Sequence, residues 1–150
     1  MVATGLSCDA YHETAPSAGV CAGRWTTRTP GVPGSRPTRA WWWRTARAAL
    51  NDPTEAAALV ALGGPTTVTG IKGAIGHTSG TAALHGLDVA VRCLRAGVVP
   101  PIAGLRTPLP EAEGLDLVRD RPARTRATLA QVNAFGFGGV NAVTLVEAAR

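Results

Sequence analysis

Residues 133–141 are Asn-Ala-Phe-Gly-Phe-Gly-Gly-Val-Asn, and they separate two apolar stretches of the chain. The flanking stretches, 128–133 and 142–147, have the length and composition of β-strands. Glycine allows the backbone to turn tightly and to approach a ligand, and Phe135 and Phe137 project from this turn. A β-hairpin with two aromatic core anchors is the alternative interpretation. A phosphate-binding loop is excluded, because no Lys-Ser/Thr pair follows and both flanks are strands.

A second motif, residues 72–80 (Lys-Gly-Ala-Ile-Gly-His-Thr-Ser-Gly), begins in a predicted loop, 70–77, and runs into the start of a helix. We expect Thr78 to cap that helix, which should run to about Ala96 and stop at a left-handed Gly97. A histidine just before a helix N-terminus lies in a positive dipole field, which disfavours imidazolium. A neutral His77 could then donate a hydrogen bond to a carbonyl that is becoming an enolate. A buried cap histidine without chemistry is the alternative.

The helical segments carry their own signals. Asp52 as N-cap and Glu55 three residues later make a capping box with Pro53 at the first helical position, so a helix to about Leu62 is predicted. A short buried strand, 66–69, should follow it. On the helix after residue 78, one apolar face is expected to consist of Leu84, Leu87, Val91 and Leu94. Residues 98–125 are predicted to be mostly loop.

Composition fits a globular domain, with 45% hydrophobic residues and a mean hydropathy of +0.10. No apolar run is long enough to span a membrane, and the three cysteines have no disulfide spacing, so a cytoplasmic protein is expected. A Cys8–His12 dyad and a zinc site with His85 are both disfavoured, because no third ligand has sensible spacing, and no metal site is predicted. Cys93 is expected to lie in a helix core.

Taken in order, residues 51–55, 72–80 and 133–141 resemble the C-terminal half of the β-ketoacyl synthases. That family's pattern is Asn/Gly-Asp-x-x-Glu, Lys-x-x-x-Gly-His and Asn-x-Phe-Gly-Phe-Gly-Gly-x-Asn. Residues 1–20 also resemble the family's first strand after its midpoint, and 49–150 match its C-terminal domain. The resemblance implies an α/β fold of the thiolase-like layered α/β/α class, here the C-terminal half only and therefore truncated.

The resemblance also implies roles for site residues. His77 matches the second of two active-site histidines, and Lys72 matches the lysine that braces the site. Glu55 matches a nearby carboxylate, and Phe137 matches the aromatic gate of the acyl tunnel, beside Phe135. Two further residues of the last motif complete the supporting or substrate-binding set: Asn133 and Gly138.

The implied reaction is a decarboxylative Claisen condensation of an acyl thioester with malonyl-acyl carrier protein, in fatty-acid or polyketide biosynthesis. It needs no cofactor, since the phosphopantetheine of the carrier protein holds the substrates. The intact parent is expected to be a homodimer or a heterodimer of ketosynthase and chain-length factor. The nucleophilic cysteine belongs to the family's other half, so this acyltransferase fragment should be inactive alone. A non-catalytic subunit like the chain-length factors is the alternative.

Residues 21–48 do not fit the resemblance. They contain six of the fifteen basic residues, all four tryptophans and no acidic residue. Taken literally, arginine interleaved with tryptophan would suit single-stranded nucleic acid or a membrane interface. Both are disfavoured, because three adjacent tryptophans, 41–43, cannot share one face of a helix or strand. We therefore expect neither nucleic acid nor membrane as a partner.

A shifted reading frame explains the block better. Tryptophan has the single codon TGG, and we take Arg as CGN, Thr as ACN and Ala as GCN, where N is any base. A frame that starts at the third base of Trp41 and runs into residues 44–48 then gives GTG, GTG, GCG, NAC, NGC, NCG and NGC. These codons permit Val-Val-Ala-His-Gly-Thr-Gly, the strand end and first histidine motif that the family has at this point. The hypothesis also accounts for the excess of arginine and the missing acids.

Overall fold

A computed structural model gives the structure of the chain and describes residues 3–8, 40–43, 51–62 and 67–148. The strands are β1 Ala3–Cys8, β2 Ala40–Trp43, β3 Thr67–Thr69, β4 Val98–Val99, β5 Asp116–Leu117, β6 Ala123–Arg124, β7 Leu129–Phe135 and β8 Val140–Glu147. The α-helices are α2 Asn51–Leu62, α3 Lys72–Ile75 and α4 Ala82–Ala96. The 3-10 turns are η1 Ser79–Thr81, η2 Pro110–Ala112 and η3 Phe137–Gly139.

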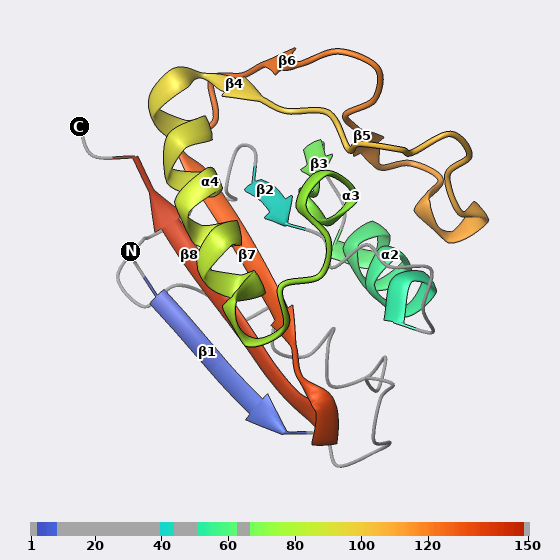
Figure 1. Cartoon of the computed structure of the whole chain (residues 1–150), viewed down its shortest axis with the longest axis vertical. Helices are drawn as coiled ribbons and strands as arrows, with labels where there is room; N and C mark the ends of the chain where they lie inside the picture. The colour runs from blue at the N-terminus through green and yellow to red at the C-terminus, as the bar shows by residue number, and fades with distance from the viewer. Residues whose placement is uncertain (1–2, 9–39, 44–50, 63–66, 149–150) are drawn as a thin grey trace.

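Six strands form the main sheet in the order β1-β8-β7-β2-β3-β5 (Figure 1). The pairs β1–β8 and β8–β7 are antiparallel, whereas β7–β2, β2–β3 and β3–β5 are parallel. A separate two-stranded ribbon joins β4 to β6. Because β2, α2 and β3 follow one another and the two strands are parallel, they form a β-α-β unit beside the long β7–β8 hairpin.

The side chains of β7 alternate between the two faces of the sheet, and a helix covers each face. Successive side chains of a strand point to opposite faces of the sheet. Ala130 and Val132 belong to a buried cluster that includes residues of α4, and Figure 1 shows α4 lying across β7 and β8. Phe135, on the opposite face, packs against Ala58 and Leu59 of α2. The sheet is therefore covered by α4 on one face and α2 on the other, which gives the expected α/β/α layering.

The end of α4 follows the sequence expectation, and so does its apolar face at Leu87, Val91 and Leu94, which are buried in or packed against the core cluster. The helix ends at Ala96, and Gly97 adopts the left-handed conformation with φ 64°. Leu84, however, is 65% exposed, so the predicted apolar face is wrong at its first member. The buried residues of α4 are Gly86, Ala90, Cys93 and Leu94. Small side chains at 86 and 90 let the helix backbone approach the sheet, which turns Leu84 away from it.

Helix α2 starts within one residue of its predicted N-cap and ends at Leu62, as expected. The helix begins at Asn51, one residue before the predicted cap, so Asp52 lies in the first turn. Pro53 is tolerated there because the first-turn N–H groups have no partner within the helix. The predicted strand 66–69 is β3, and the segment predicted as mostly loop contains β4, β5, β6 and η2.

The segment Ala40–Trp43 occupies the centre of the sheet as β2. Its backbone pairs with β3 on one side and with β7 on the other, with Trp42 opposite Val68 and Gln131. The strand ends at Trp43, the residue after which the shifted frame permits the histidine motif. The remainder of the block, 21–39 and 44–48, lies outside the described residues. Central strands of α/β sheets are covered on both faces and are mostly apolar. The position of β2 therefore agrees better with the Val-Val-Ala sequence of the shifted frame than with a surface that binds nucleic acid.

The nucleotide sequence of the locus tests the frame hypothesis directly. We expect one insertion or deletion near codon 21 and a compensating one near codon 48, because the flanking segments match the family in the present frame. Resequencing the locus and reading the shifted frame is the measurement. An unbroken frame shared with an intact, full-length gene that also encodes Trp41–Trp43 would sink the hypothesis.

Candidate active site

The two motifs begin at the same edge of the parallel part of the sheet. Trp43 is level with Thr69 of β3 and with Val132 of β7. Lys72 follows β3 after three residues, and Asn133 is the next residue of β7, so both lie toward the carboxyl ends of the two parallel strands that flank β2. In α/β proteins, ligands bind at this edge.

The loop that carries Lys72 and His77 is more ordered than predicted. The segment 70–77 was expected to be a loop, but Lys72–Ile75 form the single turn α3, in which the Ile75 N–H donates to the Ile71 carbonyl at 3.0 Å. Gly76, at φ 77°, ends that turn in a conformation that favours glycine. Lys72 is only 8% exposed, whereas His77 is exposed. The lysine thus faces the protein while the histidine is accessible.

His77 has a defined hydrogen-bond geometry. The backbone N–H of Ser79 donates to Nδ1 of His77 at 3.0 Å, with Ser79 at φ 48°. A ring nitrogen that accepts a hydrogen bond has no proton, so a neutral His77 carries its proton on Nε2. The expected cap role of Thr78 is wrong, because its side chain makes no capping bond. The imidazole accepts the first N–H of η1, the turn leading into α4, in its place.

Glu55 and Asn133 come together although 78 residues separate them. Both are 1% exposed, and the Asn133 amide donates from Nδ2 to Oε1 of Glu55 at 3.2 Å. Gln131, 4% exposed, donates from Nε2 to Oδ1 of Asn133 at 2.7 Å. Gln131 was not among the predicted site residues. A polar residue inside an apolar predicted strand was the available signal.

The glycine-rich turn places its two aromatic residues differently. Phe135 is half-buried and packs against the cluster that contains Leu59 and Val68. Phe137 is 83% exposed in η3. Gly138, at φ 74°, has the positive dihedral that reverses the chain there. The accessible Phe137 is free to contact a substrate or another protein surface, which is compatible with the gate role that the resemblance implies.

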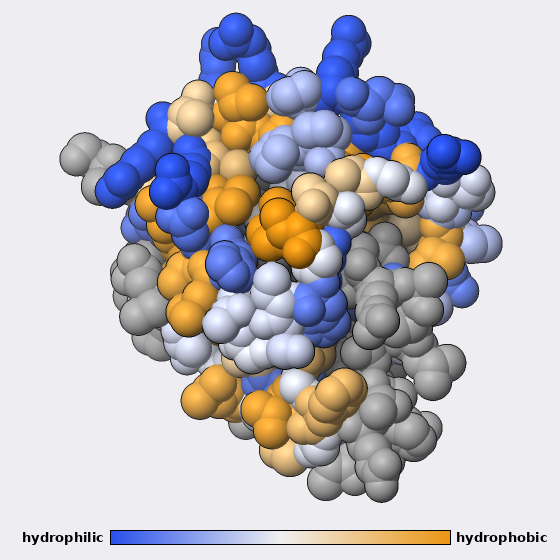
Figure 2. All heavy atoms as spheres, in the orientation of Figure 1, coloured by the Kyte–Doolittle hydropathy of each residue, from blue (hydrophilic) through white to orange (hydrophobic). Residues whose placement is uncertain are grey.

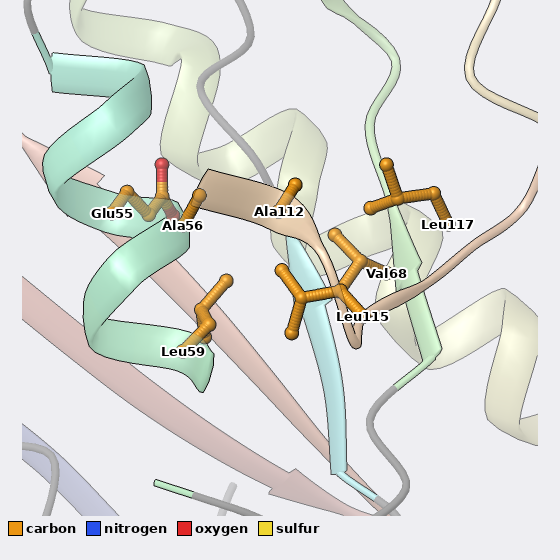
Figure 3. Close-up of a pocket in the computed structure, with 7 residues that line it drawn as sticks. All are labelled: Glu55, Ala56, Leu59, Val68, Ala112, Leu115 and Leu117. Carbon is orange, nitrogen blue, oxygen red and sulfur yellow. The ribbon is translucent and has the colours of Figure 1, made fainter. Parts of the chain in front are cut away.

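A small pocket lies between α2 and the segment 112–117. Its lining residues, shown in Figure 3, are Glu55, Ala56, Leu59, Val68, Ala112, Leu115 and Leu117. Glu55 supplies the one charged group of this lining, and the other six residues are apolar. Glu55 thus borders an apolar pocket and is also hydrogen-bonded through Oε1 to the amide of Asn133.

The two described cysteines have different environments. Cys8, exposed at the end of β1, donates from Sγ to the Gly138 carbonyl at 3.4 Å. Cys93 is buried in α4, as predicted, and desolvation raises the pKa of its thiol to about 11. His12, the other half of the rejected dyad, lies outside the described residues.

No group of metal-ligating side chains occurs among the residues that the structure describes. No helix in those same segments is both long and apolar enough to cross a bilayer.

Thiol labelling should distinguish these cysteines. With Cys21 replaced by Ser, we expect Cys8 to react with a maleimide at pH 8 and Cys93 to react roughly 100-fold or more slowly, because only about 0.1% of a thiol with pKa 11 is ionised there. The rate at Cys93 should rise between pH 8 and pH 10 or on unfolding in urea. Peptide mass spectrometry measures both sites. Equal rates at pH 8 would contradict the burial of Cys93.

Comparison with known proteins supports the expected fold. Residues 46–106 match the family model "Beta-ketoacyl synthase, C-terminal domain". The ishigamide ketosynthase/chain length factor superposes with a TM-score of 0.88 at 27% identity, over 99% of this chain and 38% of that one. A β-ketoacyl synthase from Burkholderia phymatum superposes with a TM-score of 0.85 at 21% identity, over 99% and 37%. The latter likeness concerns the fold alone.

Sequence relatives are polyketide synthases. The highly reducing polyketide synthase cm3B of Cordyceps militaris is 37% identical over 110 residues, which is 66% of this chain and 4% of that protein. The spectinabilin polyketide synthase system protein NorC of Streptomyces orinoci is 36% identical over 115 residues, 67% and 5% of the respective chains. The present chain thus spans only a small part of these curated relatives.

The layered sheet and the two motifs at its edge define a thiolase-like fold. Within that class, the chain corresponds to the C-terminal half of a β-ketoacyl synthase.

Proposed function

We propose that this chain is part of a condensing acyltransferase that joins an acyl thioester to malonyl-acyl carrier protein. The observation that carries the proposal is the hydrogen bond from the Ser79 N–H to Nδ1 of His77. In a neutral ring this bond puts the proton on Nε2, on an exposed histidine next to the helix N-terminus that disfavours imidazolium. That donor suits an oxygen that gains negative charge during the reaction.

The proposed reaction has two stages. An acyl group is first held as a thioester on a cysteine of the upstream half. The malonyl group then loses its carboxylate as carbon dioxide, and the electron pair of the broken C–C bond forms an enolate. The enolate carbon attacks the acyl carbonyl, a new C–C bond forms, and the cysteine leaves as thiolate. His77 Nε2–H donates to the enolate oxygen, and no cofactor is required.

The buried residues support rather than touch the reacting atoms in this proposal. Lys72 balances the charge of Glu55, and Asn133 holds that carboxylate through the 3.2 Å bond. Phe137 acts as the gate for the acyl chain, with Phe135 and Gly138 shaping the turn beneath it. These roles are carried over from the family, and the burial and exposure reported above are compatible with them.

The proposed partners are an acyl carrier protein and a second ketosynthase-type subunit. One structural relative is a ketosynthase/chain length factor, and another is described as a type II PKS acyl-carrier protein in complex with its ketosynthase. We place the activity in polyketide assembly in the cytoplasm, because the sequence relatives are polyketide synthases and the cysteine spacing suits a reducing compartment.

The experiment uses a full-length enzyme made by restoring the reading frame and adding the upstream half. Mass spectrometry follows the acyl-enzyme, and trapped carbon dioxide reports decarboxylation of malonyl-carrier protein. Both signals and a β-ketoacyl product are expected. Carbon dioxide release without an acyl-enzyme, or an upstream half without cysteine at the nucleophile position, would favour a chain-length-factor-like subunit.

A further inference from the structure

Three buried polar side chains form a continuous row behind the candidate site. Gln131 and Asn133 lie two residues apart on β7, so they share the face of the sheet toward α2, where Glu55 meets them. Gln131 is 4% exposed, and the other two are 1% exposed. Polar groups buried this deeply require hydrogen-bond partners, since an unsatisfied one costs about 1–3 kcal/mol.

The row has a direction. A carboxylate only accepts hydrogen bonds, so Asn133 must present its NH₂ group to Glu55, at 3.2 Å. Its Oδ1 then points the opposite way and requires a donor. The NH₂ group of Gln131 is that donor, at 2.7 Å. Each amide therefore donates toward the carboxylate, and the orientation of Asn133 depends on its neighbour two residues earlier.

We propose that Gln131 is a positioning residue that fixes the orientation of the Asn133 amide and, through it, the carboxylate of Glu55. We call the directed row of hydrogen bonds from Gln131 through Asn133 to Glu55 the relay. The importance of Gln131 for condensation rests on the proposed function, whereas the existence of the relay does not. Gln131 touches no reacting atom in this proposal. It determines which end of Asn133 faces Glu55.

A role in packing alone makes a different prediction from a directed relay. Gln131→Met keeps the length of the side chain and removes the donor. Gln131→Glu keeps the shape and replaces the donor with an acceptor, so Asn133 can no longer satisfy both neighbours. Glu55→Gln supplies a group that can donate. The double variant Gln131→Glu/Glu55→Gln therefore reverses the row, with Gln at 55 donating to Asn133 and Asn133 donating to Glu at 131.

The test is a double-mutant cycle on the 150-residue chain, measured by pulse proteolysis in urea at low protein concentration. Gln131→Glu is expected to raise the unfolding equilibrium constant about 10- to 100-fold, and the reversed double variant should recover at least half of that loss on the logarithmic scale. Gln131→Met should not be rescued by Glu55→Gln. Losses that simply add in the reversed pair, or an equal rescue of Gln131→Met, would overturn the relay.

This cycle involves no catalysis, so its outcome is independent of the proposed reaction. A rescued double variant in a protein that never condenses substrates would support the relay and refute the function. Additive losses in an enzyme that condenses normally would do the reverse.

Discussion

His77→Ala in the full-length enzyme is expected to leave acyl loading intact and to slow carbon dioxide release from malonyl-carrier protein by about 10²–10³-fold. Loading needs a cysteine thiolate, which the upstream half is proposed to supply. Decarboxylation instead places negative charge on the thioester oxygen. The Ser79 N–H bond to Nδ1 puts the proton of a neutral His77 on Nε2. We propose that this N–H donates to the thioester oxygen, so its loss should affect only the second stage.

His85, eight residues after His77, provides a matched control. His85→Ala removes an exposed histidine of α4 and should change neither stage. Lys72→Ala should slow the same step as His77→Ala, because the buried ammonium is proposed to balance Glu55 rather than to contact the acyl chain. The acyl-enzyme is measured by mass spectrometry beside trapped carbon dioxide. Decarboxylation at the parent rate in His77→Ala would leave His77 as a helix-cap residue without a chemical role.

Local signals predicted most of the backbone because they act over a few residues. Gly97 ends α4 as expected, because glycine readily adopts the left-handed conformation that stops a helix. The prolines that follow, Pro100 and Pro101, cannot continue the helix. The strands on both sides of the glycine-rich turn were predicted within a few residues of β7 and β8. The thiolase-like architecture itself came from the family resemblance, not from periodicity.

Long-range contacts explain what the sequence could not predict. Leu84 has helical spacing with Leu87 and Val91, yet it is 65% exposed because the sheet lies against the smaller residues of α4. The bond between Asn133 and Glu55 joins residues 78 positions apart, and nothing local indicates their pairing. A strand at Trp41–Trp43 was predicted only through the shifted frame, since these residues have no strand periodicity that selects a face. The position of β2 at the centre of the sheet was not predicted, because it depends on pairing with the distant strand β7.

The 150-residue chain alone is expected to form neither an acyl-enzyme nor a β-ketoacyl product. Among the described residues, Cys93 is buried with the pKa of its thiol raised to about 11, which leaves almost no thiolate at neutral pH. Cys8 is exposed, but it lies at the end of an edge strand and donates to the Gly138 carbonyl. Neither cysteine stands at a helix N-terminus, the environment that lowers a thiol pKa.

The surface of the chain predicts a second property of the isolated chain, self-association. Leu6, Phe137 and Val140 are 66%, 83% and 51% exposed, and Figure 2 shows apolar side chains gathered toward the end of the molecule where β1 ends and β8 begins. Exposed apolar groups of this kind mark contact surfaces. We therefore expect self-association that grows with protein concentration, measurable by light scattering.

Incubation with an acyl donor and malonyl-carrier protein, followed by mass spectrometry of protein and product, measures the activity of the isolated chain. The full-length enzyme is the positive control, and its Cys8→Ser variant should retain activity because the nucleophile is proposed to lie upstream. Acylation of Cys8 with steady release of β-ketoacyl product by the 150-residue chain would contradict the assignment of the nucleophile to the other half. Acylation without turnover would show only that an accessible thiol exchanges with thioesters, since condensation also needs the enolate and the geometry that the two halves create together.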